Sequence, residues 1–168
     1  GLGRAAALAL AARGVDIVFT YRGNRAEAAR VVAELEARGR KAAALQLDLT
    51  RPQDIPAFVE SLRAKLATHF GRYRIRYLLN NAGTGANAPI AATTEAQFDE
   101  MMNAHLKGPF FLTQALLPLL EDGGRILNVS SGLTRFAMAG YAAYASMKAA
   151  IETFTRYLAV ELGPRRMA

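Results

Sequence analysis

The stretch that decides the fold is Tyr77-Leu78-Leu79-Asn80-Asn81-Ala82-Gly83-Thr84-Gly85. Its first three residues are an apolar and aromatic run, which predicts a short buried strand. Amide, small and glycine residues follow, and this composition predicts a loop. Two amides and two small residues suit a loop that packs closely against a ligand and is held by side-chain bonds to backbone. A plain turn after a strand is the alternative.

Strand and helix signals alternate on both sides of this stretch. The predicted strands are 17–20, 42–47, 77–79 and 125–129, and the predicted helices are 1–13, 24–38, 53–70, 94–120 and 141–162. This alternation predicts an α/β protein with a parallel sheet covered by helices on both faces. Ligands of such sheets bind outside the carboxyl ends of the strands, so residues at those ends are the candidates for function.

Glycine, proline and capping residues predict where the helices begin and end. Gly14 and Gly39 are positioned to end the first two helices. Pro56 is expected in the first turn of its helix, where its missing N–H costs little. Thr94 and Gln97 have the spacing of a capping box.

Two further expectations concern the long helix and the strand that follows it. Gly108-Pro109 is expected to bend helix 94–120, and Asp122-Gly123-Gly124 is expected to turn the chain into strand 125–129.

The composition is that of a globular chain, with 52% hydrophobic and 21% charged residues among 168. We expect one domain over residues 1–168. The chain has no cysteine, which excludes disulfides, thiolate nucleophiles and Cys-ligated zinc, and we expect no metal site and a cytoplasmic location. No apolar stretch approaches the roughly 20 residues of a membrane span, so no membrane partner is expected. The first residue is Gly1, and we expect the chain to be a fragment.

The net charge of +7, from 21 Lys plus Arg and 14 Asp plus Glu, admits three kinds of partner. These are nucleic acid, acidic lipid and an anionic small molecule. The arginines are spread over several helices with no basic run and no interleaved aromatic residues, so nucleic acid is not expected. A small-molecule partner is the remaining expectation.

Candidate nucleotide-binding residues lie in the first third of the chain. Gly1-Leu2-Gly3 opens a helix, where backbone N–H groups can approach a phosphate, although an ordinary glycine turn is the alternative. Tyr21-Arg22 ends the next strand, where a dinucleotide fold places the adenosine ribose. An acidic residue there would repel a 2′-phosphate, whereas Arg22, with Arg25 nearby, could bind it. This favours NADP over NAD; the alternative is a surface arginine.

Asp48 follows the strand 42–47. Its carboxylate could accept a hydrogen bond from an adenine amino group or from the backbone of its own turn, and both remain open.

Candidate catalytic residues lie near the start of helix 141–162. Tyr144 and Lys148 are four residues apart and therefore share one face of the helix. A free tyrosine has a pKa of about 10, and an ammonium held close stabilises the phenolate, which suits a general acid or base. A tyrosine beside a solvated lysine is the alternative. Tyr141 lacks such a partner because its i+4 residue is alanine.

Ser131 follows the strand 125–129, and its hydroxyl could hold a substrate carbonyl oxygen. Ser130 is the competing candidate.

In order and spacing, these motifs make the chain similar to the short-chain dehydrogenase/reductase family, and to its 3-oxoacyl-reductase-like members in particular. The matching residues are Gly1-Leu2-Gly3, Arg22, Asp48-Leu49, Asn80-Asn81-Ala82-Gly83, Ser131 and Tyr144-Ala145-Ser146-Met147-Lys148. The resemblance covers essentially the whole chain. It implies a Rossmann-like, doubly wound sheet in three layers (α/β/α). The family's first strand and its C-terminal substrate segment have no counterpart here, so the domain is expected to be incomplete at both ends.

The resemblance implies an NAD(P)-dependent oxidoreductase that interconverts a carbonyl and a secondary alcohol. NADP(H) is preferred and NAD(H) is possible. In the family's mechanism, Tyr144 would protonate the carbonyl oxygen, Ser131 would orient it, and Lys148 would assist the tyrosine and bind the nicotinamide ribose. The cofactor would be bordered by Asn81, Ala82, Gly83, Asp48 and Leu49. A non-catalytic dinucleotide-binding or sensor protein on the same fold is the alternative.

The resemblance also bears on assembly and substrate. Family members commonly pair through two long helices, here 95–120 and 141–162, so a dimer or tetramer of identical chains is expected. The loops 84–89 and 132–140 indicate a rather apolar approach to the site.

One residue departs from the family's pattern. His105, in Ala104-His105-Leu106-Lys107-Gly108, stands where the family has a catalytic asparagine, and Asn103 is out of register by two. The family's asparagine holds a water that links the lysine to solvent. A neutral imidazole both donates and accepts hydrogen bonds, so His105 could keep this relay. The alternative is a helix histidine bonded to a backbone carbonyl.

Overall fold

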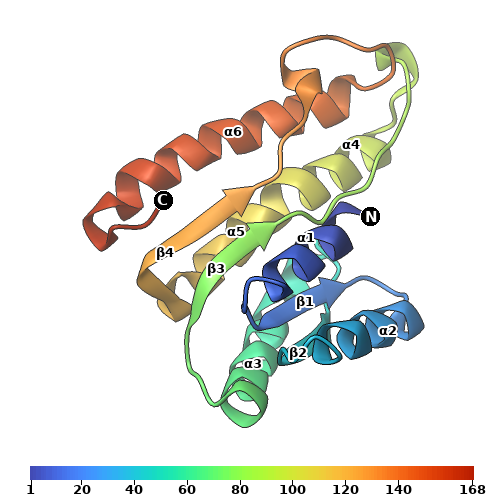
Figure 1. Cartoon of the computed structure of the whole chain (residues 1–168). Helices are drawn as coiled ribbons and strands as arrows, with labels where there is room; N and C mark the ends of the chain where they lie inside the picture. The colour runs from blue at the N-terminus through green and yellow to red at the C-terminus, as the bar shows by residue number, and fades with distance from the viewer. The chain divides into compact units, whose positions relative to one another are not determined.

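Helices and strands follow one another in the order that the sequence predicts (Figure 1). The computed structural model describes all of residues 1–168, and the chain divides into two compact units. The first unit comprises residues 1–48 and 53–73, and the second comprises residues 49–52 and 74–168. That residues 1–168 belong to one domain stays a prediction. No helix combines the length and the apolar character that crossing a membrane requires.

The first unit is built on two parallel strands. Its elements are α1 (Leu2–Ala11), β1 (Ile17–Tyr21), α2 (Arg25–Glu36), β2 (Ala42–Gln46) and α3 (Ile55–Lys65), followed by a π-helical turn (Leu66–Phe70). β1 pairs with β2 in parallel, from Ile17 opposite Ala42 to Tyr21 opposite Gln46. The core joins alanines of α1 to Leu35 of α2, which is fully buried. Small side chains on α1 let this helix approach the sheet closely.

The second unit has its own parallel pair. Its elements are β3 (Ile75–Asn80), α4 (Glu95–Met102), a π-helical turn (Asn103–Lys107), α5 (Gly108–Leu116), β4 (Leu120–Asn128) and α6 (Ala142–Leu162). β3 pairs with β4 in parallel, with Asn80 opposite Asn128. Leu120, Leu162 and Met167 form a core against which Leu78 and Ile126 pack, so one face of this sheet is covered. The backbone of Ala168 bonds to Gly124 and Ile126 along β4.

The expected helix signals are present. Gly14 and Gly39 adopt positive φ angles of 85° and 73° just beyond α1 and α2, a conformation that suits glycine. Pro56 lies in the first turn of α3. Thr94 and Gln97 make both bonds of the capping box at the start of α4.

Two details differ from the sequence prediction. The long helix 94–120 is interrupted by the π-helical turn Asn103–Lys107, directly before the expected bend at Gly108-Pro109. β4 begins at Leu120, so Asp122-Gly123-Gly124 lies inside the strand and is not a turn before it. A shift in the pairing between Ile75 and Tyr77 accommodates this segment, in which Gly123 has a φ of 75°. Glycine permits that backbone within a strand at an irregularity of this kind.

A buried amide ties the second unit together at the carboxyl ends of its strands. The Asn80 side-chain Nδ2 donates to Thr113 Oγ1 of α5 at 3.1 Å and to Asn128 Oδ1 of β4 at 2.8 Å. Asn128 Nδ2 in turn donates to Thr155 Oγ1 of α6 at 2.9 Å. The sequence predicted bonds from this loop's amides to backbone, and at Asn80 the partners are side chains. The network therefore joins two strands and two helices just before the loop 81–84.

Replacing Thr113 with valine tests this network. Thr113 is fully buried, and valine keeps its shape but removes the oxygen that accepts from Asn80. Leaving a buried donor without one of its partners costs about 1–3 kcal/mol, so we expect Thr113→Val to lower the free energy of unfolding by that amount in urea titrations. The control is Thr153→Val, at an exposed position of α6, which should change stability by less than about 0.5 kcal/mol. Equal effects of the two substitutions would contradict the role given to Asn80.

Candidate active site

The Tyr144 and Lys148 side chains lie next to each other on the first turns of α6. Lys148 Nζ is 5.7 Å from the centroid of the Tyr144 ring, as their spacing of one helical turn predicts. Nζ also donates a hydrogen bond to Val129 O, just beyond β4, at 2.7 Å. Lys148 is buried, with 6% of its surface exposed. The ammonium is thus held between the end of β4 and a tyrosine ring.

Burial lowers the pKa of Lys148, because a low-dielectric environment disfavours the charged form. The single acceptor at Val129 leaves two of the three ammonium protons available for other partners. A partly desolvated cation acts more strongly on its neighbours than a solvated one. Lys148 Nζ therefore keeps hydrogen-bonding capacity beside the Tyr144 ring.

The two candidate serines have different partners. Ser130 Oγ donates to Glu152 Oε1 of α6, and Thr134 Oγ1 donates to the same oxygen. These two bonds are the main reason that the pKa of Glu152 is lowered. Ser131 Oγ accepts from the Leu133 amide at 3.3 Å and caps a short 3-10 turn. The hydroxyl proton of Ser130 is therefore used in the bond to Glu152 of α6, whereas that of Ser131 remains available to a ligand.

His105 contacts both the loop 81–84 and Tyr144. Its Nε2 lies 2.7 Å from Thr84 O, and its ring meets the Tyr144 ring edge-on, with centroids 5.0 Å apart. A Cβ atom at Gly83 would lie 2.8 Å from His105 Cε1, so this position has room for glycine only. The imidazole of His105 therefore contacts both the loop predicted from Asn80-Asn81-Ala82-Gly83 and the candidate catalytic tyrosine.

Burial lowers the pKa of His105, and the positive charge of Lys148 lowers it further, while the hydrogen bond to Thr84 acts in the opposite direction. Of the two readings drawn from the sequence, the bond to a backbone carbonyl is present at Nε2. Nδ1 is buried and has no hydrogen-bond partner. The proton relay through His105 stays a prediction.

The candidate nucleotide-binding residues of the first unit lie at the N-terminus of a helix and after the ends of two strands. Gly1 is the N-cap of α1, with no side-chain cap at that helix end. Arg22 follows β1 and is exposed, and Asp48 follows β2. Because β1 and β2 are parallel, Arg22 and Asp48 lie at the same edge of their sheet. Leu49 belongs to the second unit, where its backbone oxygen lies against Gly108.

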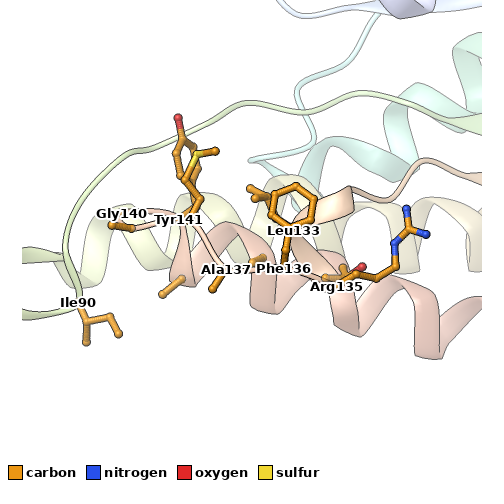
Figure 2. A pocket seen from close by; sticks show the side chains of 12 residues that line it. Ile90, Leu133, Arg135, Phe136, Ala137, Gly140 and Tyr141 are labelled. Atoms are coloured by element: carbon orange, nitrogen blue, oxygen red, sulfur yellow. The ribbon is translucent and has the colours of Figure 1, made fainter.

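An apolar pocket of about 480 Å³ lies in the second unit. Figure 2 shows Ile90 at one end of the pocket, Arg135 at the other and Phe136 between them. The expected loop 132–140 supplies most of the lining, together with Tyr141, Ala142 and Ala145 of the α6 region, whereas residues 84–89 do not line it. The side chain of Asn87 instead packs against Gly140. Residues on both sides of Tyr144 in the sequence therefore line the pocket, whereas Tyr144 itself is not among the lining residues.

The partners that hold these residues in place belong to no motif that the sequence displays. Thr113 and Asn128 gave no motif, although an asparagine at the end of each of two paired strands is a signal that could have linked Asn80 to Asn128. Glu152, which accepts a hydrogen bond from the Ser130 hydroxyl, lies one helical turn beyond Lys148. This spacing places Glu152 on the same face of α6 as Lys148 and is a signal that could have found it.

The parallel α/β fold and the Tyr144–Lys148 pair define a short-chain dehydrogenase/reductase. The family model described as enoyl-(acyl carrier protein) reductase matches residues 1–167, and the chain belongs to this family. Both the resemblance drawn from the motifs and the predicted fold class are thereby confirmed.

Individual relatives are similar over nearly the whole chain. The hydroxynaphthalene reductase arp2 of Aspergillus fumigatus is 36% identical over 163 residues, which cover 97% of this chain and 58% of the relative. The tetrahydroxynaphthalene reductase PfmaG of Pestalotiopsis fici is 35% identical over 168 residues, covering 99% and 58%. The chain therefore spans about three fifths of the length of these relatives.

Solved structures show the same fold. The landomycin C-6 ketoreductase LanV, with bound NADP and rabelomycin, superposes with a TM-score of 0.96 at 36% identity and is covered to 69%, with all of this chain matched. A blue fluorescent protein from a metagenomic library, in complex with NADPH, has a TM-score of 0.88 at 36% identity, with 98% of this chain and 66% of that protein covered.

Proposed function

We propose that the protein interconverts a ketone and a secondary alcohol by hydride transfer with NADP(H), with Tyr144 as the proton donor and acceptor. The observation that carries this proposal is the Tyr144 ring beside the buried ammonium of Lys148. The reductases among the relatives, and the NADP held by LanV, support it. NAD(H) is the second possible cofactor.

The donor groups of the second unit suit the nicotinamide end of this cofactor. Lys148 has two ammonium protons to offer to ribose hydroxyls, and the loop of Asn81, Ala82 and Gly83 exposes its small residues. When bound, the cofactor supplies or removes the hydride.

The donor groups of the first unit suit the adenosine end. The start of α1, at Gly1, Leu2 and Gly3, presents backbone N–H groups that can bind phosphate. Arg22, beside Tyr21, offers an exposed guanidinium for a 2′-phosphate. Asp48, at the same sheet edge as Arg22, and Leu49, the next residue in the chain, are assigned to the surroundings of the adenine.

Three side chains carry out the proton chemistry in this proposal. In ketone reduction, the Tyr144 hydroxyl gives its proton to the carbonyl oxygen as negative charge develops there. Lys148 stabilises the phenolate that forms, because its charge is close and only partly solvated. Ser131 uses its available hydroxyl proton to hold the same carbonyl oxygen. In alcohol oxidation the phenolate takes the proton back.

We further propose that the substrate is a polycyclic aromatic ketone. Two relatives are named for hydroxynaphthalenes and LanV was solved with rabelomycin, so aromatic substrates recur among the similar proteins. The apolar pocket beside Tyr141 and Ala145 is consistent with a flat, apolar ligand near this end of α6.

The protein is also proposed to form a dimer or tetramer through α5 and α6. Phe110 and Phe111 are 39% and 42% exposed, and Tyr157 and Val160 on α6 are 63% and 77% exposed. Phe110 contacts the half-buried Phe154 of α6 at 4.7 Å between ring centroids, so α5 and α6 adjoin at aromatic residues. An apolar surface of this kind favours a protein interface.

Tyr144→Phe tests the chemistry. It removes the hydroxyl and keeps the ring that packs against His105, so the protein should fold and bind NADPH. Because general acid catalysis contributes about 10²–10⁴-fold, kcat for reduction of an aromatic ketone should fall at least about a hundredfold. The control is Tyr73→Phe, at a tyrosine that is 78% exposed and has no part in the proposed site, which should retain activity. Retained reduction by Tyr144→Phe would overturn the mechanism.

The alternative of a non-catalytic sensor is tested on the unaltered protein. NADPH binding without turnover of any ketone in a broad panel would favour a sensor.

Arg22→Asp tests the cofactor preference. An aspartate repels the 2′-phosphate and can bond the ribose hydroxyl, so the ratio of kcat/KM with NADPH to that with NADH should fall by at least about tenfold. The control is Arg13→Asp, which makes the same charge change at an exposed position after α1. An unchanged ratio in Arg22→Asp would mean that the 2′-phosphate is held by other residues.

Tyr157→Glu tests the assembly. A charge placed in an apolar interface is costly to desolvate, so this variant should sediment as a smaller species than the unaltered protein. The control is Tyr73→Glu, because Tyr73 is also well exposed, at 78%, but lies in the first unit. A Tyr157→Glu variant with unchanged mass in solution would exclude this part of α6 from the interface.

A further inference from the structure

Glu152 lies on α6, and its carboxylate bonds to two residues of a neighbouring segment of chain. Ser130 Oγ donates to Glu152 Oε1, and Thr134 Oγ1 lies 3.0 Å from the same oxygen. Ser131, the serine proposed to hold the substrate carbonyl oxygen, lies between these two residues in the sequence. The proposed proton chemistry makes no use of Glu152, so this carboxylate calls for an account of its own.

Each of the two hydroxyls has one proton and a second acceptor nearby. Ser130 Oγ also lies 3.4 Å from Lys148 O, but the Glu152 carboxylate is much closer. Thr134 Oγ1 is 2.9 Å from Ser131 O and 3.0 Å from Glu152 Oε1, so these two acceptors share its proton. An ionised carboxylate can only accept hydrogen bonds, and both hydroxyls therefore direct hydrogen towards Glu152.

The charge of Glu152 strengthens these bonds. The hydrogen bonds from Ser130 and Thr134 are the main influence on the pKa of Glu152 and lower it; burial acts in the opposite direction, and the charges of Arg156 and Arg135 lower the pKa further. The carboxylate is therefore ionised at neutral pH. Hydrogen bonds to an ionised acceptor are stronger than those between neutral groups.

The chain just after β4 is attached to α6 at two successive turns of the helix. Lys148 Nζ donates to Val129 O at 2.7 Å. Glu152, one turn further along α6, accepts from Ser130 Oγ. Two consecutive residues are thus bonded to side chains on the same face of α6.

The bonds to Glu152 also attach the short 3-10 turn Gly132–Thr134, for which Ser131 is the N-cap. Thr134, at the end of this turn, bonds to Glu152. Ser131 Oγ accepts from the Leu133 amide and Ser131 O from the Thr134 amide, both at 3.3 Å. Leu133 and Thr134 also line the apolar pocket, and Figure 2 shows Leu133 there. The chain is therefore bonded to α6 on both sides of Ser131, and the Ser131 hydroxyl proton takes no part in these bonds.

We propose that Glu152 is a positioning residue for Ser131: its Oε1 accepts hydrogen bonds from Ser130 and Thr134 and thereby keeps the Ser131 hydroxyl at a fixed place relative to α6, which carries Tyr144. Glu152 acts through these two residues and not on the reacting atoms. Attachment on both sides limits how far Ser131 can move, and a misplacement of about 1 Å can cost about 10²-fold in rate. The proposal rests on the proposed function, because Ser131 is the residue being positioned.

Two substitutions of Glu152 separate its acceptor oxygen from its charge. Glutamine removes the charge but keeps a carbonyl oxygen with two lone pairs. Both observed bonds use Oε1, so the glutamine NH₂ group can take the place of Oε2. Leucine is similar in size and has no acceptor. The positioning role therefore predicts that Glu152→Gln behaves like the unaltered protein and that Glu152→Leu does not.

The first experiment measures the attachment without turnover. The Thr134 and Arg135 amides bond to the carbonyl oxygens of Ser131 and Gly132 within the turn. In Glu152→Leu, hydrogen exchange at these two amides should accelerate by at least about tenfold, because the turn loses its bond to α6. In Glu152→Gln, exchange should stay within about threefold of the unaltered protein. Unchanged exchange in Glu152→Leu would overturn the attachment.

The second experiment measures the consequence for Ser131. With an aromatic ketone, kcat/KM of Glu152→Leu should fall by about tenfold, whereas that of Glu152→Gln should stay within about threefold. The Kd for NADPH should stay within about twofold in both variants, because the bond from Lys148 to Val129 O does not involve Glu152. The matched control is Glu36→Leu, the same substitution at an exposed position of α2 in the first unit, which should change neither quantity.

Three kinetic outcomes would overturn the proposal. Unchanged kcat/KM in Glu152→Leu would show that Ser131 does not depend on Glu152. Equal losses in Glu152→Gln and Glu152→Leu would show that the charge of Glu152 matters and not its acceptor oxygen. A Kd for NADPH that rises in Glu152→Leu by the same factor as kcat/KM falls would show a general disturbance of the site.

A double-mutant cycle tests whether Glu152 acts through the two hydroxyls. Ser130→Ala and Thr134→Val together remove both donors and keep Glu152. On that background, Glu152→Leu should lower kcat/KM by no more than about twofold, because residues that act through one another do not have additive effects. The same loss on both backgrounds would overturn the proposal.

The exchange measurement also distinguishes failure of this proposal from failure of the proposed function. A protein that reduces no ketone would refute the proposed function. Exchange at Thr134 and Arg135 would still support or overturn the attachment of the turn to α6, because it does not depend on turnover.

Discussion

The hydrogen bonds of the Asn80 side-chain amide are the interactions on which the second unit depends. A buried amide must find hydrogen-bond partners, and Asn80 finds them on α5 and β4, from which Asn128 continues the network to α6. The carboxyl ends of β3 and β4 are thereby held at a set distance from two helices. The loop 81–84 starts at this anchored point, so its position follows from the network.

The burial of Lys148 is a second constraint with consequences for the site. A buried ammonium needs a strong acceptor, and Val129 O supplies it at the end of β4. This bond brings the start of α6 to the strand end and with it the Tyr144 ring. Ser130 bonds to Glu152 on the same helix, so that Ser131 is the serine left with an available hydroxyl proton. The arrangement of catalytic candidates is thus a result of satisfying buried polar groups.

Features set by local geometry were predictable, and features set by packing were not. The contact between Lys148 and Tyr144 follows from helix periodicity, and the capping box at Thr94 follows from residue spacing. The expectation that Asp122-Gly123-Gly124 forms a turn was wrong, because the position of this segment inside β4 depends on pairing with β3. His105 could be recognised as unusual, but its partner Thr84 lies 21 residues earlier in the chain, beyond any local pattern.

By itself, the sequence determined the alternation of strands and helices, the family, and the residues that are candidates for the chemistry, because periodicity, turn residues and motif spacing act over a few residues. The tertiary structure alone decided which serine keeps a free hydroxyl proton, which backbone carbonyl His105 contacts, and why position 83 has room for glycine only. These depend on contacts between segments far apart in the chain, where close packing and the need to pair buried polar groups select one arrangement.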